Sequence, residues 1–162
     1  MGDELAGQIA ALLDMHHVMS LATSGPNGPH AANLFYARSG FTLLWVSDPL
    51  SRHSFEIDAD SRVAATIATD FSDFPQVQGL QLSGHAARII DESGRHSARR
   101  HLETRYPFLQ ATASLPAELR DAYEHAEFYQ LTPDRIVLID NRRRLGFKQT
   151  LDLALDRRSQ AG

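Results

Sequence analysis

The chain has 162 residues, a formal net charge of −4 and no cysteine. This length is typical of a single domain whose hydrophobic core needs no disulfide. The lack of cysteine excludes thiolate zinc sites, iron–sulfur clusters and cysteine nucleophiles, and the acidic balance argues against a nucleic-acid partner. The sequence contains no long apolar run and no basic signal-peptide start, so we expect a cytoplasmic protein with no membrane span.

Turn residues and short apolar runs alternate in the first part of the chain. Residues 3–15 carry apolar side chains at helical spacing and predict an amphipathic helix. Three strands are then expected, at residues 18–23, 30–38 and 41–47. The turn cluster at 24–29 and the Ser39-Gly40 pair would connect them as a three-stranded meander.

The middle of the chain predicts a short helix followed by two strands. Asp48 can cap the helix, with Pro49 at its first position. The strands are expected at residues 62–69 and 78–90, separated by a polar loop. Gly84 lies inside the longer strand, where a glycine indicates a bulge or a close approach of another backbone.

The last part of the chain predicts helices before strands. Two helices and two strands are expected, at residues 92–105, 117–126, 128–131 and 135–140. The turn Thr132-Pro133-Asp134 would separate the two strands. We expect one domain over residues 1–150 and a charged, frayed tail over 151–162. Six or seven strands with short connections favour a mainly β fold, an antiparallel barrel with peripheral helices, over a doubly wound sheet.

The triplet Ser51-Arg52-His53 is a candidate phosphate site. It lies in the opening turn of the predicted helix, where free N–H groups and a partial positive charge attract anions. Ser51 adds a hydroxyl, Arg52 a bidentate fork and His53 a further donor. The alternative is that all three simply lie on a solvated helix face.

Two further groups could contact a planar heterocycle. On the strand Asn33-Leu34-Phe35-Tyr36, alternation places Asn33 and Phe35 on one face, so that an amide lies beside an aromatic ring. Gln78 and Gln81 flank Gly79-Leu80, and a glutamine amide can both donate to and accept from a ring edge. Ordinary strand packing and surface glutamines are the alternatives.

Other chemistry has little support in the sequence. The eight histidines form no metal-binding array, so we expect no metal site, although one axial haem histidine stays open. No nucleophile elbow, Walker loop or dinucleotide fingerprint is present. The basic residues Arg142, Arg143 and Arg144, with Lys148 beyond them, form either a solvated turn or a clamp for an anionic substrate.

Several short segments together show a resemblance to a known family. They are Val18-Met19-Ser20-Leu21-Ala22-Thr23, Ala31-Ala32-Asn33-Leu34-Phe35-Tyr36-Ala37, Leu44-Trp45-Val46-Ser47, Ser51-Arg52-His53, Arg62-Val63-Ala64-Ala65-Thr66-Ile67 and Gly79-Leu80-Gln81-Leu82-Ser83-Gly84-His85-Ala86. In this order and spacing the chain resembles the pyridoxamine 5′-phosphate oxidase-like FMN-binding split barrels over roughly residues 5–150. The late segment at 140–148 is similar to a small bacterial branch of that family.

The resemblance implies a split β-barrel and a homodimer with FMN at the subunit interface. By this resemblance the cofactor-binding residues are Ala32, Asn33, Leu34, Phe35, Val46, Ser47, Ser51, Arg52, His53, Gln78 and Gln81. The strand at 32–35 would line the flavin, and Val46 and Ser47 would lie beside the ribityl chain and phosphate. Gln78 and Gln81 would approach the ring from the partner subunit. In the family's Ser-Arg-Lys phosphate clamp, the lysine is replaced by His53 here, a weaker and pH-dependent cation.

The expected function is that of an FMN-dependent oxidoreductase, which transfers hydride or electrons between a nicotinamide or small organic substrate and FMN. Arg142, Arg143 and Lys148 would hold an anionic part of that substrate. The basic strand motif and the late Arg-x-His of true pyridoxamine-phosphate oxidases are absent, so we expect a different substrate. The alternatives are a non-enzymatic FMN- or haem-binding protein and a deazaflavin-dependent reductase on the same fold.

Overall fold

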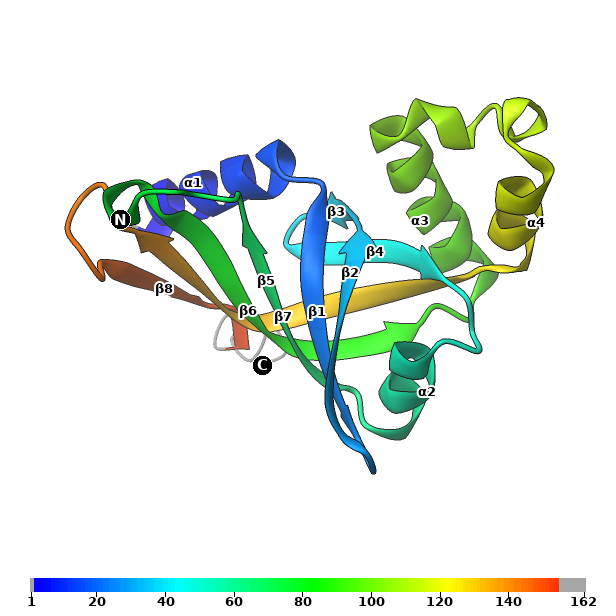
Figure 1. The fold of residues 1–162 in the computed structure, drawn as a ribbon, viewed down its shortest axis with the longest axis horizontal. Helices are drawn as coiled ribbons and strands as arrows, with labels where there is room; N and C mark the ends of the chain where they lie inside the picture. Colours follow the sequence, from blue (N-terminus) through cyan, green and yellow to red (C-terminus); the bar gives the residue numbers. More distant parts are fainter. Residues whose placement is uncertain (1, 155–162) are drawn as a thin grey trace.

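One antiparallel sheet of eight strands organises the protein, whose computed structural model describes residues 2–154 (Figure 1). The strands are β1 (Val18–Gly25), β2 (Gly28–Phe35), β3 (Ala37–Ser39), β4 (Thr42–Ser47), β5 (Arg62–Ala68), β6 (Gln78–Arg88), β7 (Glu127–Asp140) and β8 (Lys148–Asp152). Their order in the sheet is β2-β1-β5-β6-β7-β4-β3, and β8 pairs with β7. The sheet curls into a half-barrel, which confirms the predicted mainly β fold and antiparallel split barrel.

Helices lie at the periphery, as predicted. They are α1 (Gly2–Met15), α2 (Arg52–Ala59), α3 (Glu92–Arg105) and α4 (Ala117–His125), with short 3₁₀ turns at Phe74–Gln76, Pro107–Leu109 and Thr112–Ser114. Figure 1 shows α1 across one end of the barrel, α2 beside the turn end of the β1–β2 hairpin, and α3 and α4 together beyond the β4 side. None of the helices among residues 2–154 is long and apolar enough to cross a membrane.

The barrel core follows from alternation along the strands. β1 and β5 each bury every second side chain, such as Leu21 and Ile67, and the buried face of α1 closes one end of the core. Trp45, the single tryptophan, is fully buried and stacks on Tyr129 with ring centroids 5.7 Å apart. Unfolding of the barrel therefore exposes an intrinsic fluorescent probe.

The predicted three-stranded meander is wrong, because the second strand breaks at Tyr36. β2 ends at Phe35 and pairs only with β1, whereas β3 begins at Ala37 and pairs with β4. The fully buried Tyr36 turns inward, and its hydroxyl donates to the Leu13 carbonyl over 2.8 Å. Ala37 after it is buried as well, so the regular alternation of β2 ends at this point, and the outer edge of β2 has no partner strand within residues 2–154.

The predicted turn between two late strands is also wrong, because β7 continues through it. The β6–β7 register shifts between Ser83 and Gly84, where Pro133 lies opposite Gly84. A Cβ on Gly84 would lie 2.7 Å from the Pro133 Cα, so only glycine allows this approach. The predicted bulge and close approach at Gly84 are both confirmed, and the bulge absorbs a proline that cannot donate to the ladder.

Two other boundaries differ from expectation. α2 begins at Arg52 with Ser51 as its N-cap, because Asp48 instead caps a preceding turn through the Leu50 N–H, 2.8 Å away. β8 pairs with β7 although its residues were expected to end the domain. Its last two residues, 151 and 152, belong to the predicted tail, and residues 155–162 of that tail lie outside the described part of the chain.

Candidate cofactor site

The barrel has an open seam between β2 and the end of β4. β2 has no partner on its outer edge, and the last residues of β4 pair only with β7. The chain leaves β4 at Ser47, turns, and continues into α2, which lies across the seam. His53 on α2 contacts both sides: its ring stacks on His30 of β2 with centroids 6.4 Å apart, and its Nε2 lies 2.5 Å from the Ser47 Oγ.

A chain of hydroxyl groups surrounds His53. The Ser51 Oγ lies 3.1 Å from the same Nε2 and donates to the Ser54 Oγ over 2.8 Å. Ser54, which is fully buried, donates in turn to the Asp48 carbonyl over 2.9 Å. The tertiary structure therefore gathers hydroxyls from β4 and from the start of α2 around one imidazole.

Arg52 is held by a buried carboxylate. Its Nε donates to Glu56 over 2.8 Å, and its Nη2 donates to the Gly28 carbonyl over 3.1 Å. The other Glu56 oxygen accepts from the Thr23 hydroxyl over 2.5 Å. These contacts, from Thr23 first and Arg52 second, lower the pKa of Glu56. Arg52 and Glu56 form an ion pair in which the arginine side chain is 43% exposed and the glutamate side chain 8%.

His53 is a poor base in this environment. Only 7% of the residue is exposed, and its burial lowers its pKa below the usual value. The neighbouring His30 lowers the pKa of His53 further, whereas Glu56 acts in the opposite direction. Desolvation penalises the charged imidazolium most. His53 is therefore neutral near pH 7 unless a ligand supplies negative charge.

The predicted strand residues divide between the two faces of β2. Ala32 and Leu34 are half-buried on the inner face, whereas Asn33 and Phe35 are exposed on the outer face, so the expected alternation is confirmed. Asn33 accepts from the Ser20 hydroxyl over 2.7 Å. Val46, on β4, is half-buried and packs against the apolar cluster beneath α3.

The glutamines do not lie together. Gln81 is exposed on the outer face of β6, in one cross-strand row with Thr66, Ser20 and Asn33. Gln78 pairs with Asp140 at the far end of β7, whereas Ser47 pairs with Glu127 at its beginning. The ends of this 14-residue strand are separated by ~40 Å of extended chain. One protomer alone therefore does not bring Gln78 to His53.

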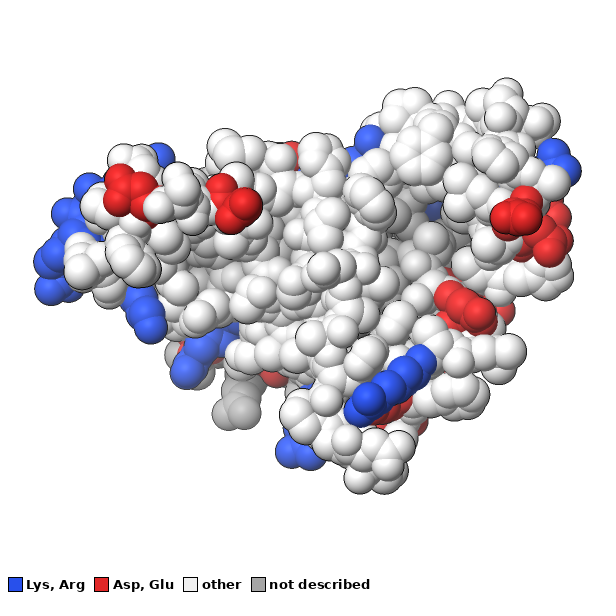
Figure 2. Space-filling model, viewed as in Figure 1, with Lys and Arg blue, Asp and Glu red and all other residues white. Residues whose placement is uncertain are grey.

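Two of the three predicted substrate residues, Arg142 and Arg143, line a separate cavity of about 590 Å³ that Gln78 also lines. Arg142 donates twice to the Asp140 carboxylate, over 2.8 and 2.9 Å, and Arg143 stacks on Phe147 with its guanidinium carbon 5.2 Å from the ring centroid. Lys148 is exposed on β8. Figure 2 shows Lys and Arg side chains gathered at this end of the molecule, where β7 connects to β8.

Sequence analysis missed three residues that shape the site: His30, Thr23 and Glu56. Glu56 had a usable signal, because it follows Arg52 by four residues, the spacing of an ion pair on one helix face. His30 and Thr23 had none, since both come from the distant β1–β2 hairpin. Gly25 was also missed, and a Cβ there would lie 2.7 Å from the Glu56 carboxylate oxygen.

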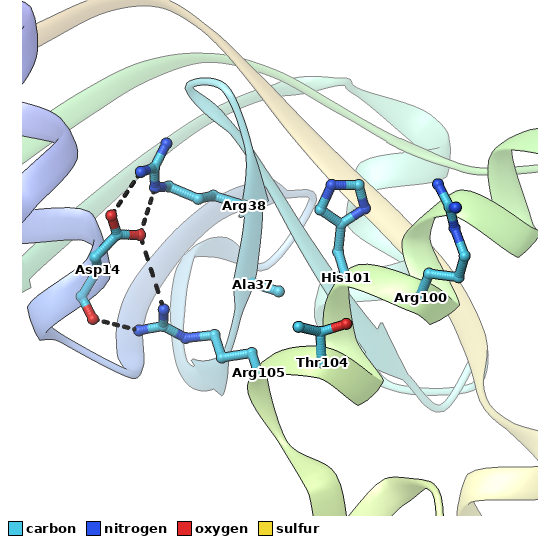
Figure 3. A pocket seen from close by; sticks show the side chains of 7 residues that line it. All are labelled: Asp14, Ala37, Arg38, Arg100, His101, Thr104 and Arg105. Atoms are coloured by element: carbon cyan, nitrogen blue, oxygen red, sulfur yellow. Dashed lines mark hydrogen bonds and ion pairs between the residues drawn. The ribbon is translucent and has the colours of Figure 1, made fainter.

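A second arginine-lined cavity, of about 520 Å³, lies between α1, β3 and α3 (Figure 3). Arg38 donates to Asp14 over 2.7 and 2.6 Å, and Arg105 donates to the carbonyls of Leu13 and Asp14 at the end of α1. Figure 3 shows both guanidinium groups directed at Asp14, with His101 on the opposite wall. This arrangement fastens α3 to α1, which is a structural role.

The donors at the seam fit a phosphate group. We name Ser47, Ser51, Arg52 and His53 the α2 clamp. It offers two hydroxyls, a partly exposed guanidinium and an imidazole, beside the first N–H groups of α2, which have no helical partner. Only the Glu56 carboxylate opposes an anion, and it lies buried behind Arg52. Within residues 2–154 no group of acidic, histidine or cysteine side chains could hold a metal ion.

Comparison with known proteins identifies the family and agrees with the fold. The sequence matches the family model for pyridoxamine 5′-phosphate oxidase over residues 5–139. The chain belongs to this family. A search of curated protein sequences found no match.

Solved structures share the fold of this family member at low sequence identity. A heme binding protein from Mycobacterium smegmatis superposes with a TM-score of 0.71 at 20% identity, covering 95% of this chain and 59% of that one. General Stress Protein 26 from Bacillus anthracis gives 0.64 at 16% identity, covering 93% and 99%. An FAD-binding protein from Mesorhizobium loti gives 0.63 at 17% identity, covering 80% and 89%. At such identities the likeness shows the fold alone.

Proposed function

We propose that this protein is an FMN-binding flavoprotein that works as an oxidoreductase, with the FMN phosphate held by the α2 clamp. The observation that carries the proposal is that the Ser47 and Ser51 hydroxyls both lie within 3.1 Å of the His53 Nε2, beside Arg52. Family membership and an FAD-binding structural neighbour support a flavin. Bound flavin supplies hydride or electron transfer, while the chain supplies orientation and charge.

The residues of the seam have separable tasks in this proposal. Arg52 pairs with the phosphate through Nη1, while Glu56 accepts from its Nε and the Gly28 carbonyl accepts from its Nη2. Ser47 and Ser51 donate to or accept from phosphate oxygens, and Ala32 and Leu34 on the inner face of β2 exclude water. The substrate would be a nicotinamide or a small organic molecule other than pyridoxamine phosphate.

A homodimer is part of the proposal, and the outer face of the sheet supports it. Ala31, Ala22, Ala64 and Ser83 form one exposed cross-strand row over β2, β1, β5 and β6. Small uncharged side chains leave this face flat and free of charge repulsion, which suits packing against a second copy. Such packing would allow Gln81 or Gln78 of one copy to approach the site of the other, and size-exclusion chromatography with light scattering tests it.

The absorbance spectrum of the purified protein, followed by fluorescence titration of the apoprotein with FMN, tests the cofactor. Yellow protein or submicromolar FMN binding supports the proposal and justifies a screen of NADH and NADPH as donors. A Soret band would establish haem binding instead, which the Mycobacterium smegmatis neighbour makes the second candidate. A colourless protein that does not bind FMN contradicts the proposal, and deazaflavin is then the next ligand to test.

A matched pair of variants tests the clamp. Arg52→Ala should weaken FMN binding by about 1–3 kcal/mol, the range of a charge-assisted hydrogen bond. Arg142→Ala removes an arginine from the other end of the sheet and should leave the dissociation constant unchanged. Riboflavin, which lacks the phosphate, should bind both variants and the parent protein alike. An unchanged FMN affinity in Arg52→Ala would remove Arg52 from the site.

A further inference from the structure

The α2 clamp and its neighbour Glu56 together carry no net charge before a ligand binds. Arg52 contributes one positive charge, and Glu56 balances it through the 2.8 Å ion pair. The charged or titratable groups around His53 come from two elements, His30 on β2 and the Arg52–Glu56 pair on α2, while Ser47 on β4 adds only a hydroxyl. A phosphomonoester brings a charge of about −1.5 to −2 at pH 7. The clamp therefore needs a further positive charge to hold it.

Hydrogen-bond directions identify the atom that can accept a proton. The Asp48 carbonyl can only accept, so the single hydroxyl hydrogen of Ser54 is donated to it. Ser51 must then donate to Ser54, and its contact with His53 requires a proton on the imidazole Nε2. The neutral ring therefore carries its hydrogen on Nε2, and Nδ1 is the vacant position.

This arrangement also leaves one hydroxyl proton available. The single hydrogen on Nε2 is then shared between the Ser51 Oγ at 3.1 Å and the Ser47 Oγ at 2.5 Å, so the O–H of Ser47 is not needed for its contact with His53. The hydroxyl can donate to an incoming anion without breaking the hydrogen bonds of the seam. An anion beside it raises the affinity of the imidazole for a second proton, because an opposite charge favours the charged form.

We propose that the α2 clamp binds phosphate together with a proton, which His53 takes up at Nδ1. The inference rests on the proposed function for the identity of the ligand, and it makes His53 the residue that couples affinity to pH. Neutral imidazole becomes imidazolium, no covalent bond forms, and the proton comes from solvent. A clamp with a permanent cation in this position would show no such coupling.

Isothermal titration calorimetry of FMN, at about pH 7.5 in buffers of different ionisation enthalpy, measures the proton directly. The phosphomonoester is already a dianion there, since its second pKa is about 6, so any uptake belongs to the protein. The parent protein should take up close to one proton per FMN, and its affinity should rise by up to about tenfold for each unit of pH decrease.

Variants assign the proton. His53→Lys should bind FMN with no proton uptake, and His53→Gln should bind about tenfold or more weakly, also without uptake. Glu56→Gln keeps a group that can accept from Arg52 but removes the opposing charge, so it should bind more tightly and take up a smaller fraction of a proton. His30→Gln should retain the uptake. Riboflavin should bind the parent protein without proton uptake.

A second measurement separates this inference from the flavin assignment. The imidazole of His53 is titrated by NMR with and without sulfate, which stays a dianion over the whole range. If sulfate raises the pKa of His53 in a protein that does not bind FMN, the proposal of proton-linked phosphate binding stands. Only the assignment of FMN as the ligand is then contradicted. FMN binding without proton uptake in the parent protein, or uptake that persists in His53→Gln, overturns the inference. A pKa of His53 that is the same with and without sulfate also overturns the inference.

Discussion

Two basic regions of this protein place arginine beside a buried carboxylate, yet only one of them offers further donors to a ligand. At the seam, Arg52 pairs with Glu56 among the hydroxyls of Ser47 and Ser51. At the β7–β8 connection, Arg142 directs both its Nε and its Nη2 at Asp140. The first region combines donors from β4 and from the start of α2, whereas the Arg142–Asp140 pair is local to one turn.

The difference shows that arginine content is a poor guide to anion binding. The sequence has three consecutive arginines at 142–144 and a single one at 52. In the Arg142–Asp140 pair, two guanidinium nitrogens donate to the same carboxylate, which occupies donors that a ligand would need. A site depends on which donors stay uncommitted after folding, and that depends on contacts between distant segments.

The largest effect on stability is expected from Gly25→Ala. A Cβ at this position would lie 2.7–2.9 Å from Glu56 side-chain atoms, displacing a carboxylate that both Arg52 and Thr23 hold. We expect a loss of about 3 kcal/mol in the free energy of unfolding, measured by urea denaturation with Trp45 fluorescence. Gly7→Ala, in open space on α1, is the control and should stabilise by about 0.5–1 kcal/mol. Equal free energies of unfolding for the two variants would show that the Glu56 side chain can rearrange without loss of stability.

A smaller loss is expected from Thr23→Val. The substitution keeps the shape of a residue that is 4% exposed and removes its 2.5 Å hydrogen bond to Glu56. Hydrogen bonds to charged groups contribute about 1.5–3 kcal/mol, so a loss of about 2 kcal/mol should appear in the same denaturation experiment. Thr69→Val, on the exposed loop after β5, should change stability by less than about 0.5 kcal/mol. If the two variants match, the buried network does not stabilise the seam.

At the other basic region, Arg142→Ala should have a smaller effect still. The Arg142 side chain is 52% exposed, and Asp140 keeps its contacts with Arg143 and Gln78. The expected loss is about 1 kcal/mol or less, the range of exposed ion pairs, and it should shrink further in high salt. Arg144→Ala serves as the matched exposed control. A loss as large as that of Thr23→Val would mean that the two regions do not differ as described.

The pH dependence of stability should separate the two regions by the pH range in which stability is lost, although the effect is the smallest. Burial lowers the pKa of His53 from 6.5 in the folded protein. The unfolded chain then binds more protons than the folded one, so stability falls as pH drops below about 6.5. The hydrogen bond from Arg142 lowers the pKa of Asp140 from 3.8, so its contribution is lost only below that pH.

Thermal unfolding between about pH 2.5 and 7.5 measures both contributions. His53→Gln should flatten the decline that begins just below about pH 6.5 and leave the decline below about pH 4 intact. Arg142→Ala should do the reverse, since it acts on the carboxylate alone. An unchanged profile in His53→Gln would contradict the buried, neutral state of that histidine.

Periodicity and local chemistry were sufficient for most of the secondary structure. Sequence patterns predicted helices at 3–15 and 92–105 and strands at 62–69 and 78–90. The folded protein has a helix or strand of the predicted type at each of these places. Prediction was wrong where a single buried contact overrode the local pattern. Tyr36 ended a strand by turning into the core, and Gly84 allowed a proline to stay inside β7.

For the site, the amino-acid sequence by itself determined the triplet Ser51-Arg52-His53, its place at a helix start and the resemblance to a flavin-binding barrel. Only the tertiary structure decided that Glu56 and Thr23 hold Arg52, that His30 and Ser47 enclose His53, and that Gln78 lies at the opposite end of the sheet. The physical reason is that helix starts are encoded within a few residues. The charge state of a buried imidazole and the pairing of a guanidinium depend instead on groups that reach the seam from strands far apart in the chain.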